Sequence, residues 1–146
     1  MKQTMKITFL AILFLTLFGC ASTSQFVKYP RGESLGSGTA RIYVLRPSIL
    51  GGGIKMKVYA NDRIIGKTGP KSYLCWDVKV GEYTLKSVAE NVDYFTINAK
   101  AGKTYFIVQK PKFGIVSYRA SLQILEEKEG SDILSKLKHP HVKYAE

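Results

Sequence analysis

Histidine and cysteine are scarce in this sequence, which limits the chemistry that the chain can perform. Its 146 residues include two cysteines and two histidines. Two cysteines form at most one disulfide, so the chain is not a disulfide-stabilised scaffold. The histidines, His139 and His141, flank Pro140 near the C-terminus, with no cysteine or carboxylate beside them. We therefore expect solvated tail residues there, and neither a metal site nor a catalytic centre of the Ser-His-Asp type.

A complete phosphate-binding loop is also missing. Gly66-Lys67-Thr68 and Gly102-Lys103-Thr104 share three residues with such loops. The full motif has a glycine five residues before the first of these three. This chain has Asn61 and Ile97 there. Neither triplet follows a strand and opens a helix, so we interpret both as turns that lead into strands, and we expect no bound cofactor.

No apolar run is long enough to cross a membrane as a helix. Residues 7–18 form the main run. Twelve residues rise only about 18 Å as a helix, against roughly 30 Å of hydrocarbon. Lys2 and Lys6 precede the run, and Gly19 and Cys20 follow it. This order of basic, apolar and small residues predicts a cleaved secretory signal over residues 1–19.

The end of this segment, Leu-Phe-Gly-Cys at residues 17–20, resembles the lipobox of bacterial lipoproteins. The resemblance implies cleavage before Cys20, a diacylglyceryl group on its thiol, and insertion of the acyl chains into a lipid bilayer. Ala21 stands where an Asp typically retains lipoproteins in the inner membrane, so the resemblance points to the outer membrane, facing the periplasm. Cys75 is then the remaining thiol. It lies in the apolar run 73–76, which predicts a buried, inert side chain.

Acidic residues are half as numerous as basic ones. The chain has 22 Lys and Arg against 11 Asp and Glu, a formal net charge of +11. The signal segment carries two of the lysines and no acid, so the mature chain keeps a charge of about +9. Such a charge attracts anionic lipid, glycan or protein surfaces. Export from the cytoplasm argues against nucleic acid as a partner.

Four lysines are the candidates for contact with an anionic surface: Lys55, Lys57, Lys110 and Lys112. The first two share a predicted strand face with Tyr59, and the last two flank Pro111 in a predicted loop, next to Phe113. If these segments meet at one end of the domain, they form a cationic patch with aromatic side chains. The alternative is that the lysines protect edge strands and turns from edge-to-edge aggregation.

Most of the chain consists of short strand-like runs separated by turns. Residues 20–38 are rich in Ser, Gly and Thr, which predicts a flexible tether after the lipidated cysteine. Strands are predicted over residues 41–46, 55–60, 63–67, 72–80, 83–89, 93–99, 104–109 and 116–124. Seven or eight strands, with no room for helical crossovers, predict an all-β domain over residues 39–128, an antiparallel sandwich or small barrel, of which we expect the β-sandwich.

Two local patterns within this domain make specific predictions. Asn61 and Asp62 predict a tight turn between two paired strands. In the last run, Val116, Ala120 and Leu122 belong to an apolar set that alternates with polar residues. That period of two predicts one buried face.

A short helix is predicted in the C-terminal segment 129–146. Ser131 is expected to cap it, and Pro140 to end it. Ile133, Leu134 and Leu137 form an apolar stripe. So short a helix is stable only if this stripe packs on the sandwich.

Four segments carry a family resemblance. They read ARIYVLRP at residues 40–47, VYANDRIIG at 58–66, VGEYTL at 80–85 and AGKTYF at 101–106. They resemble an uncharacterised domain family found mostly in bacterial lipoproteins, and their order is similar to that of PEGA-like β-sandwich repeats of surface-layer and envelope proteins. The resemblance implies a small β-sandwich on a lipoprotein. It implies no catalytic residue, because the family has no established activity.

The whole sequence predicts a membrane-anchored envelope lipoprotein whose sandwich is a non-enzymatic binding or scaffolding module. Two alternatives stay open. One is a periplasmic hydrolase that uses carboxylates brought together by folding. The other is a surface-displayed lipoprotein that binds a host molecule. A deep pocket with two close, pKa-shifted acids would favour the enzyme, and a flat face with exposed apolar or basic residues would favour the binding module.

Overall fold

The computed structural model describes residues 34–137 of the chain. The predicted signal segment 1–19, Cys20, the tether up to residue 33 and the tail from residue 138, with His139 and His141, lie outside the described residues. The elements in chain order are β1 Thr39–Arg46, β2 Met56–Ala60, β3 Arg63–Thr68, β4 Ser72–Lys79, β5 Gly81–Val88, β6 Val92–Ala99, β7 Thr104–Phe113, β8 Tyr118–Leu125 and α2 Glu127–Lys136.

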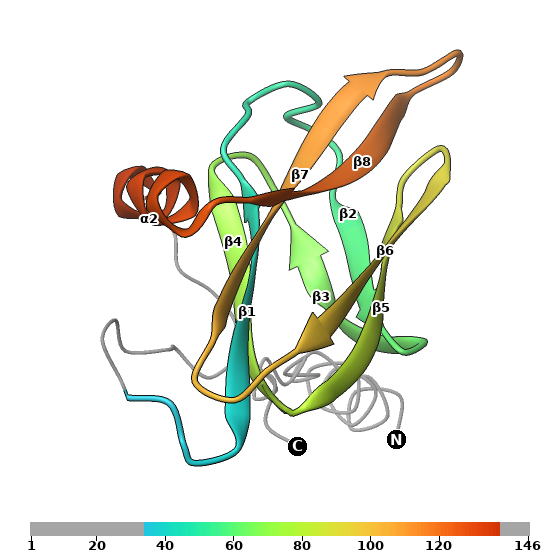
Figure 1. Ribbon diagram of the computed structural model, residues 1–146. Coiled ribbons are helices and arrows are strands. Elements are labelled where there is room, and N and C mark those ends of the chain that lie inside the picture. Colours follow the sequence, from blue (N-terminus) through green and yellow to red (C-terminus); the bar gives the residue numbers. More distant parts are fainter. Residues whose placement is uncertain (1–33, 138–146) are drawn as a thin grey trace, which may run out of the picture.

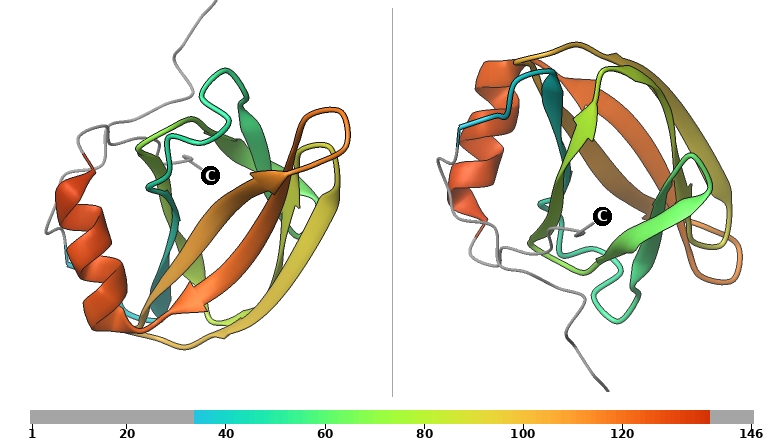
Figure 2. Two further views of the ribbon diagram at one scale, coloured as in Figure 1. Left: turned by 90° about the horizontal axis from the view of Figure 1, so that it is seen from above. Right: turned by 90° about the horizontal axis from the view of Figure 1, so that it is seen from below.

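The strands form two sheets that enclose a common core (Figure 1). One sheet has the order β4-β1-β7-β8 and the other the order β3-β2-β5-β6. The helix α2 lies against β7 and β1, outside the first sheet, as both views in Figure 2 show. The prediction of an all-β sandwich with a short C-terminal helix is therefore confirmed.

One strand pair departs from the antiparallel prediction. β1 and β7 run parallel, with Ile42 paired to Tyr105 and Val44 to Ile107. Parallel neighbours need a long connection between them. The segment from β2 to β6 provides this connection. It contains β4, which pairs with β1, and all four strands of the second sheet. The remaining pairs are antiparallel.

Alternate side chains of the strands fill the space between the sheets. The main buried cluster comprises Ala40, Ile42, Val44, Val58, Ala60, Ile65, Leu74, Trp76, Val78, Leu85, Ile97, Ala99, Ile107 and Leu122. In β4, three of these residues share the inward face, as predicted. Val80, predicted to lie on the same face, is exposed because the strand ends before it.

The predicted hairpin of β2 and β3 is confirmed. Asn61 and Asp62 both have positive φ angles, 46° and 63°. A two-residue turn of this kind matches the right-handed twist of the strands that it joins. In β2 the side chain of Lys57 is exposed between the buried Met56 and Val58, which is the expected period of two.

The interpretation of Gly66-Lys67-Thr68 as a turn is wrong, because the triplet lies inside β3. Gly66 is there because Leu74 of the neighbouring β4 packs against its Cα, and an added Cβ would meet the Leu74 side chain at 3.0 Å. Gly102-Lys103-Thr104 does lead into a strand, since β7 begins at its threonine.

A second buried cluster lies between the first sheet and α2. It comprises Tyr43, Leu45, Tyr73, Cys75, Phe106 and Leu137, with Leu125, Ile133 and Leu134 packed against it. The predicted apolar stripe of the helix therefore packs on the sandwich, as its stability requires. Cys75 is fully buried, as predicted. Burial, together with the neighbouring Cys75, raises the pKa of Tyr43 above its ordinary value.

The helix begins earlier than the sequence predicted. Glu126 occupies the N-cap position, and Ser131, the predicted cap, lies inside the helix. Glu127 and Glu129 favour the earlier start, because carboxylates near the first turn interact favourably with the positive end of the helix dipole. Gly130 lies against Phe106 so closely that a Cβ would overlap the ring. This close approach fixes the position of the helix on β7.

The hairpin of β7 and β8 also differs from the prediction. β7 continues to Phe113, so Lys110, Pro111 and Lys112 lie in a strand and not in a loop. The pairing of β7 with β1 ends at Val108, and beyond this residue β7 pairs with β8 alone. This part of β7 is an edge strand, where proline is tolerated. β8 begins at Tyr118, so Val116 lies in the turn and is exposed, whereas the sequence predicted it on the buried face.

Candidate functional site

Four connections meet at one end of the sandwich. Because the strands alternate in direction along the chain, β1, β3, β5 and β7 all end there. We call this the loop end. It consists of the β1–β2 loop (47–55), the β3–β4 turn (69–71), the β5–β6 turn (89–91) and the β7–β8 tip (113–117). In Figure 1 the tip projects beyond the rest of the molecule.

A buried arginine organises the β1–β2 loop. Arg46, the last residue of β1, is fully buried. Its Nη1 donates to the carbonyl oxygens of Ile54 and Thr68 at 2.7 and 3.1 Å, and its Nη2 to those of Leu50 and Gly51 at 3.1 and 2.9 Å. Burial lowers the pKa of Arg46, but a guanidinium stays protonated in proteins. The positive charge is therefore held by carbonyl dipoles of the loop.

A polar network lies beside this arginine, between the sheets. Thr68 of β3 donates to the side-chain oxygen of Gln109 of β7, and the Gln109 Nε2 donates to the Ser87 hydroxyl of β5 at 2.6 Å. All three residues are fully buried. The network joins the two sheets across the core. Each of its members would leave an unsatisfied buried group if its partner were removed.

Glu90 in the β5–β6 turn holds the β7–β8 tip. Its Oε1 accepts a hydrogen bond from the Ile115 amide at 2.9 Å, and its Oε2 accepts from the amides of Val116 and Ser117 at 3.3 and 2.7 Å. These bonds lower the pKa of Glu90 below its ordinary value of 4.5. Gly114 is required because a Cβ there would overlap the Glu90 carboxylate. The tip is thus a fixed structure, not a loose loop.

Further contacts tie the tip to the rest of the loop end. The Tyr118 and Phe113 rings lie 5.5 Å apart, and Gly51 of the β1–β2 loop packs on Tyr118, which a Cβ would meet at 3.1 Å. The Asn91 side chain makes two hydrogen bonds to the backbone of Ala120, at 2.7 and 3.0 Å. These side-chain bonds close the seam between β6 and β8, where the two sheets meet.

Large apolar side chains are exposed at this end. The exposed fractions are 76% for Phe113, 92% for Ile115, 91% for Val116 and 69% for Ile49 in the neighbouring loop. Exposed apolar side chains that lie next to one another mark interaction sites more often than scattered single ones do. The sequence analysis missed Ile115 and Glu90. The consecutive pair Ile115-Val116 after Gly114 breaks the alternation of β8, and this is the signal that could have revealed the tip.

The structure places the four candidate lysines at the loop end, but on opposite sides. Lys55 precedes β2, and Lys57 is the second residue of this strand, with its side chain exposed between two buried neighbours. Lys110 and Lys112 lie on β7 in the first sheet, where the Lys110 Nζ donates to the Gln123 side chain at 2.8 Å. A flat partner surface that lay against one of the two sheets would contact only one of the two lysine pairs. A surface that meets the domain end-on approaches both.

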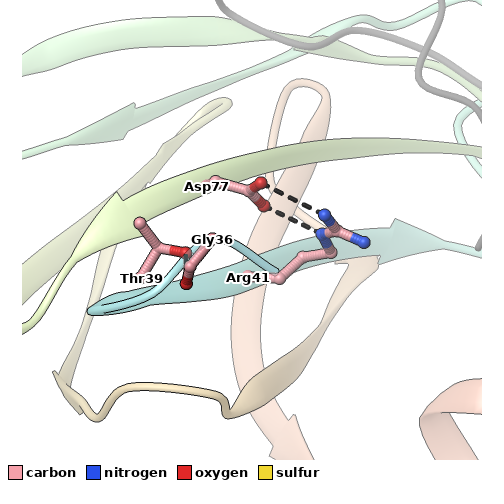
Figure 3. A network of polar contacts seen from close by, with 4 residues as sticks. All are labelled: Gly36, Thr39, Arg41 and Asp77. Carbon is pink, nitrogen blue, oxygen red and sulfur yellow. Dashed lines mark hydrogen bonds and ion pairs between the residues drawn. The ribbon is translucent and has the colours of Figure 1, made fainter. Parts of the chain in front are cut away.

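The described residues also form clefts away from the loop end. A cleft of about 650 Å³ lies beside α2 and is lined by residues of α2, β1 and β7. In its floor, Arg41 is almost buried and holds Asp77 of β4 through two bonds, at 2.8 and 3.1 Å (Figure 3). Thr39, shown in the same figure, donates to the Gly36 carbonyl at 2.7 Å. These contacts fasten the start of β1 to its neighbours.

Two general findings bear on chemistry. Within residues 34–137, no three His, Cys, Asp or Glu side chains come together as ligands for a metal ion. In the same part of the chain, no helix has the length and apolar character needed to span a membrane.

The fold and this site define a class: a small all-β protein with a rigid, apolar-tipped and basic loop end. Residues 36–121 match the family described as "Protein of unknown function (DUF2846)", and the chain belongs to that family. The matched segment includes Arg46, Glu90 and the β7–β8 tip. The predicted membership of an uncharacterised domain family is thereby confirmed.

A Haemophilus influenzae protein with the description "Uncharacterized protein" is similar to this chain. The two are 34% identical over 102 residues, which is 68% of this chain and 60% of that protein. The chain therefore spans less than two thirds of the length of this relative.

Proposed function

We propose that the protein is a lipid-anchored lipoprotein of the bacterial cell envelope and that its sandwich is a non-enzymatic binding or scaffolding module. The lipobox-like residues 17–20 support the anchor at Cys20. By the same resemblance, the outer membrane facing the periplasm is the proposed location. A relationship to PEGA-like envelope repeats remains a prediction from the order of the sequence motifs.

The exposed loop end is the observation that carries the binding role. Its apolar tip is held in one conformation by Glu90 before any partner arrives, so little conformational entropy is lost on docking. Lys55, Lys57, Lys110 and Lys112 border the same end and add positive charge. An anionic surface met end-on is the partner that this arrangement fits.

The alternative functions receive less support. A carboxylate-based hydrolase needs an acid whose pKa is raised. Glu90, which lies at the exposed loop end, has a lowered pKa, because it accepts hydrogen bonds from backbone amides. A surface-displayed host-interaction protein would share the same loop end. Protease treatment of intact cells distinguishes this case, because a periplasm-facing protein stays protected.

The anchor is tested by replacing each cysteine in turn. The Cys20→Ser precursor should stay uncleaved and should incorporate no labelled palmitate. Cys75→Ala is the matched control, because it removes the other thiol of the chain and should leave cleavage and labelling unchanged. Normal processing of the Cys20→Ser variant would show that the lipobox interpretation is wrong.

A further inference from the structure

The β7–β8 tip combines two features that are costly in a protein surrounded only by water. Phe113, Ile115 and Val116 are exposed next to one another. Directly behind them, Lys112 of β7 is paired with Arg119 of β8, and both are exposed. Like charges that face each other across two strands are destabilising. Glu90 balances only part of this charge. An anionic partner would relieve the repulsion and cover the apolar side chains together.

The backbone amides of the tip already have hydrogen-bond partners. The Gly114 amide donates to the Ser117 carbonyl at 2.9 Å, and the next three amides donate to Glu90. Removing water from backbone donors is unfavourable unless they have partners. Since these four already have them, the tip can leave water without unsatisfied amides.

The shape of the tip selects between two kinds of partner. A stable protein interface covers about 800 Å² on each side, with matching relief. Here the apolar surface is a narrow convex hairpin turn that projects from the body (Figures 1 and 2). A convex apolar point with cations at its base fits a fluid bilayer, where the side chains enter the acyl region and the cations stay at the phosphates.

We propose that the β7–β8 tip docks into an anionic phospholipid bilayer: Phe113, Ile115 and Val116 enter the interface, and Lys112 and Arg119 bind lipid phosphates. The proposal rests on the proposed function only in that the acyl anchor brings the domain to a membrane. With the tether attached at the opposite end of β1, docking of the tip gives the domain a second point of attachment.

The test places a tryptophan in the tip of the mature lipidated protein, reconstituted into vesicles. Ile115→Trp is tolerated by the fold because the side chain is 92% exposed. The matched control is Val80→Trp, in the exposed turn at the other end of the sandwich. Trp76 is buried and common to both proteins, so its emission is subtracted with the parent protein.

In vesicles that contain phosphatidylglycerol, the Ile115→Trp emission should shift to the blue and be quenched by brominated acyl chains. The Val80→Trp emission should do neither. Replacing Lys112 and Arg119 with Gln in the Ile115→Trp protein should abolish the quenching, as should high salt. Equal emission of the two tryptophans with vesicles would overturn the proposal. So would a blue shift that appears only after envelope proteins are added, because this result would mean protein docking.

Failure of the anchor and failure of the tip give different results. The mass of the purified protein shows whether Cys20 carries lipid. If it does not, the same emission measurements are made with the protein mixed with vesicles, and quenching of Ile115→Trp still supports docking by the tip. If the Ile115→Trp protein carries lipid but its tryptophan emission neither shifts nor is quenched, the lipid anchor is supported and docking by the tip is overturned.

Discussion

At the end of the sandwich where β1 begins, the side chains between the sheets are apolar; at the loop end, buried polar side chains lie among apolar ones such as Leu122. Ala40, Ile42 and Leu85 represent the first half of the interior, and Arg46, Gln109 and Ser87 the second. The apolar half is stabilised by burial, which is non-directional. The polar half is stabilised by hydrogen bonds with defined partners, and these fix the positions of the loops.

This difference shows how a small sandwich fixes the shape of its loop end. A purely apolar interior tolerates rearrangement as long as volume is kept. A buried guanidinium with four carbonyl partners does not, because each displaced carbonyl loses its donor. The loop end thus obtains a defined shape from the least adaptable part of the core.

The largest expected effect comes from Arg46→Ala. It leaves a cavity and four carbonyl oxygens without their donor, and it should lower the free energy of unfolding by about 3–5 kcal/mol. Leu85→Ala, in the apolar half, should cost about 2–5 kcal/mol from cavity formation alone. Urea denaturation measures both. The exposed Lys67→Ala is the control, with an effect within about 0.5 kcal/mol. Loss of less than about 1 kcal/mol in Arg46→Ala would contradict the role given to this side chain.

A smaller effect is expected from changes in the polar network of Thr68, Gln109 and Ser87. Gln109→Ala should cost about 2–3 kcal/mol, because Thr68 and Ser87 then lose a buried partner. Replacing the whole network by Thr68→Val, Ser87→Ala and Gln109→Leu should cost less than the single change, since no polar group is left unsatisfied. If the triple variant is less stable than Gln109→Ala, the network contributes net stability.

The smallest effect concerns Glu90, and it is local. The hydrogen bonds that Glu90 accepts from the tip amides lower its pKa. They therefore stabilise the tip fully above the ordinary pKa of a glutamate, and this stabilisation is lost as the pH falls through the lowered pKa of Glu90. Hydrogen exchange at Ile115 and Ser117 should therefore accelerate, relative to the intrinsic rate, as the pH falls through the lowered pKa of Glu90. Glu90→Gln should accelerate it at neutral pH, with little change in global stability. Exchange unaffected by either change would show that another contact orders the tip.

Much of the fold follows from local sequence patterns. The turn at Asn61-Asp62 and the alternation in β2 depend on neighbours in the chain, and both are confirmed. The predicted helix start at Ser131 was wrong: the helix begins after Glu126, and its Gly130 packs on Phe106, a contact that the local sequence does not reveal. The parallel pairing of β1 and β7 could not be predicted, because it depends on the path of the whole chain between them.

The candidate site was predicted only in part. Charge and composition pointed to Lys110 and Lys112, but the sequence placed them in a loop and Val116 in the core. Alternation cannot tell where a hairpin turns when apolar residues continue through the turn. The position of the turn was decided by the Glu90 carboxylate, a residue distant in sequence that binds the amides of the tip.

The strand content, the scarcity of histidine and cysteine, the excess of positive charge and the lipobox-like segment follow from the sequence alone, since each is a property of composition or of adjacent residues. Only the tertiary structure decided that Arg46 is buried, that Lys112 faces Arg119, and that the β7–β8 tip is exposed and rigid. These features depend on which strands become neighbours, and pairing between distant strands is determined by the packing of the whole core.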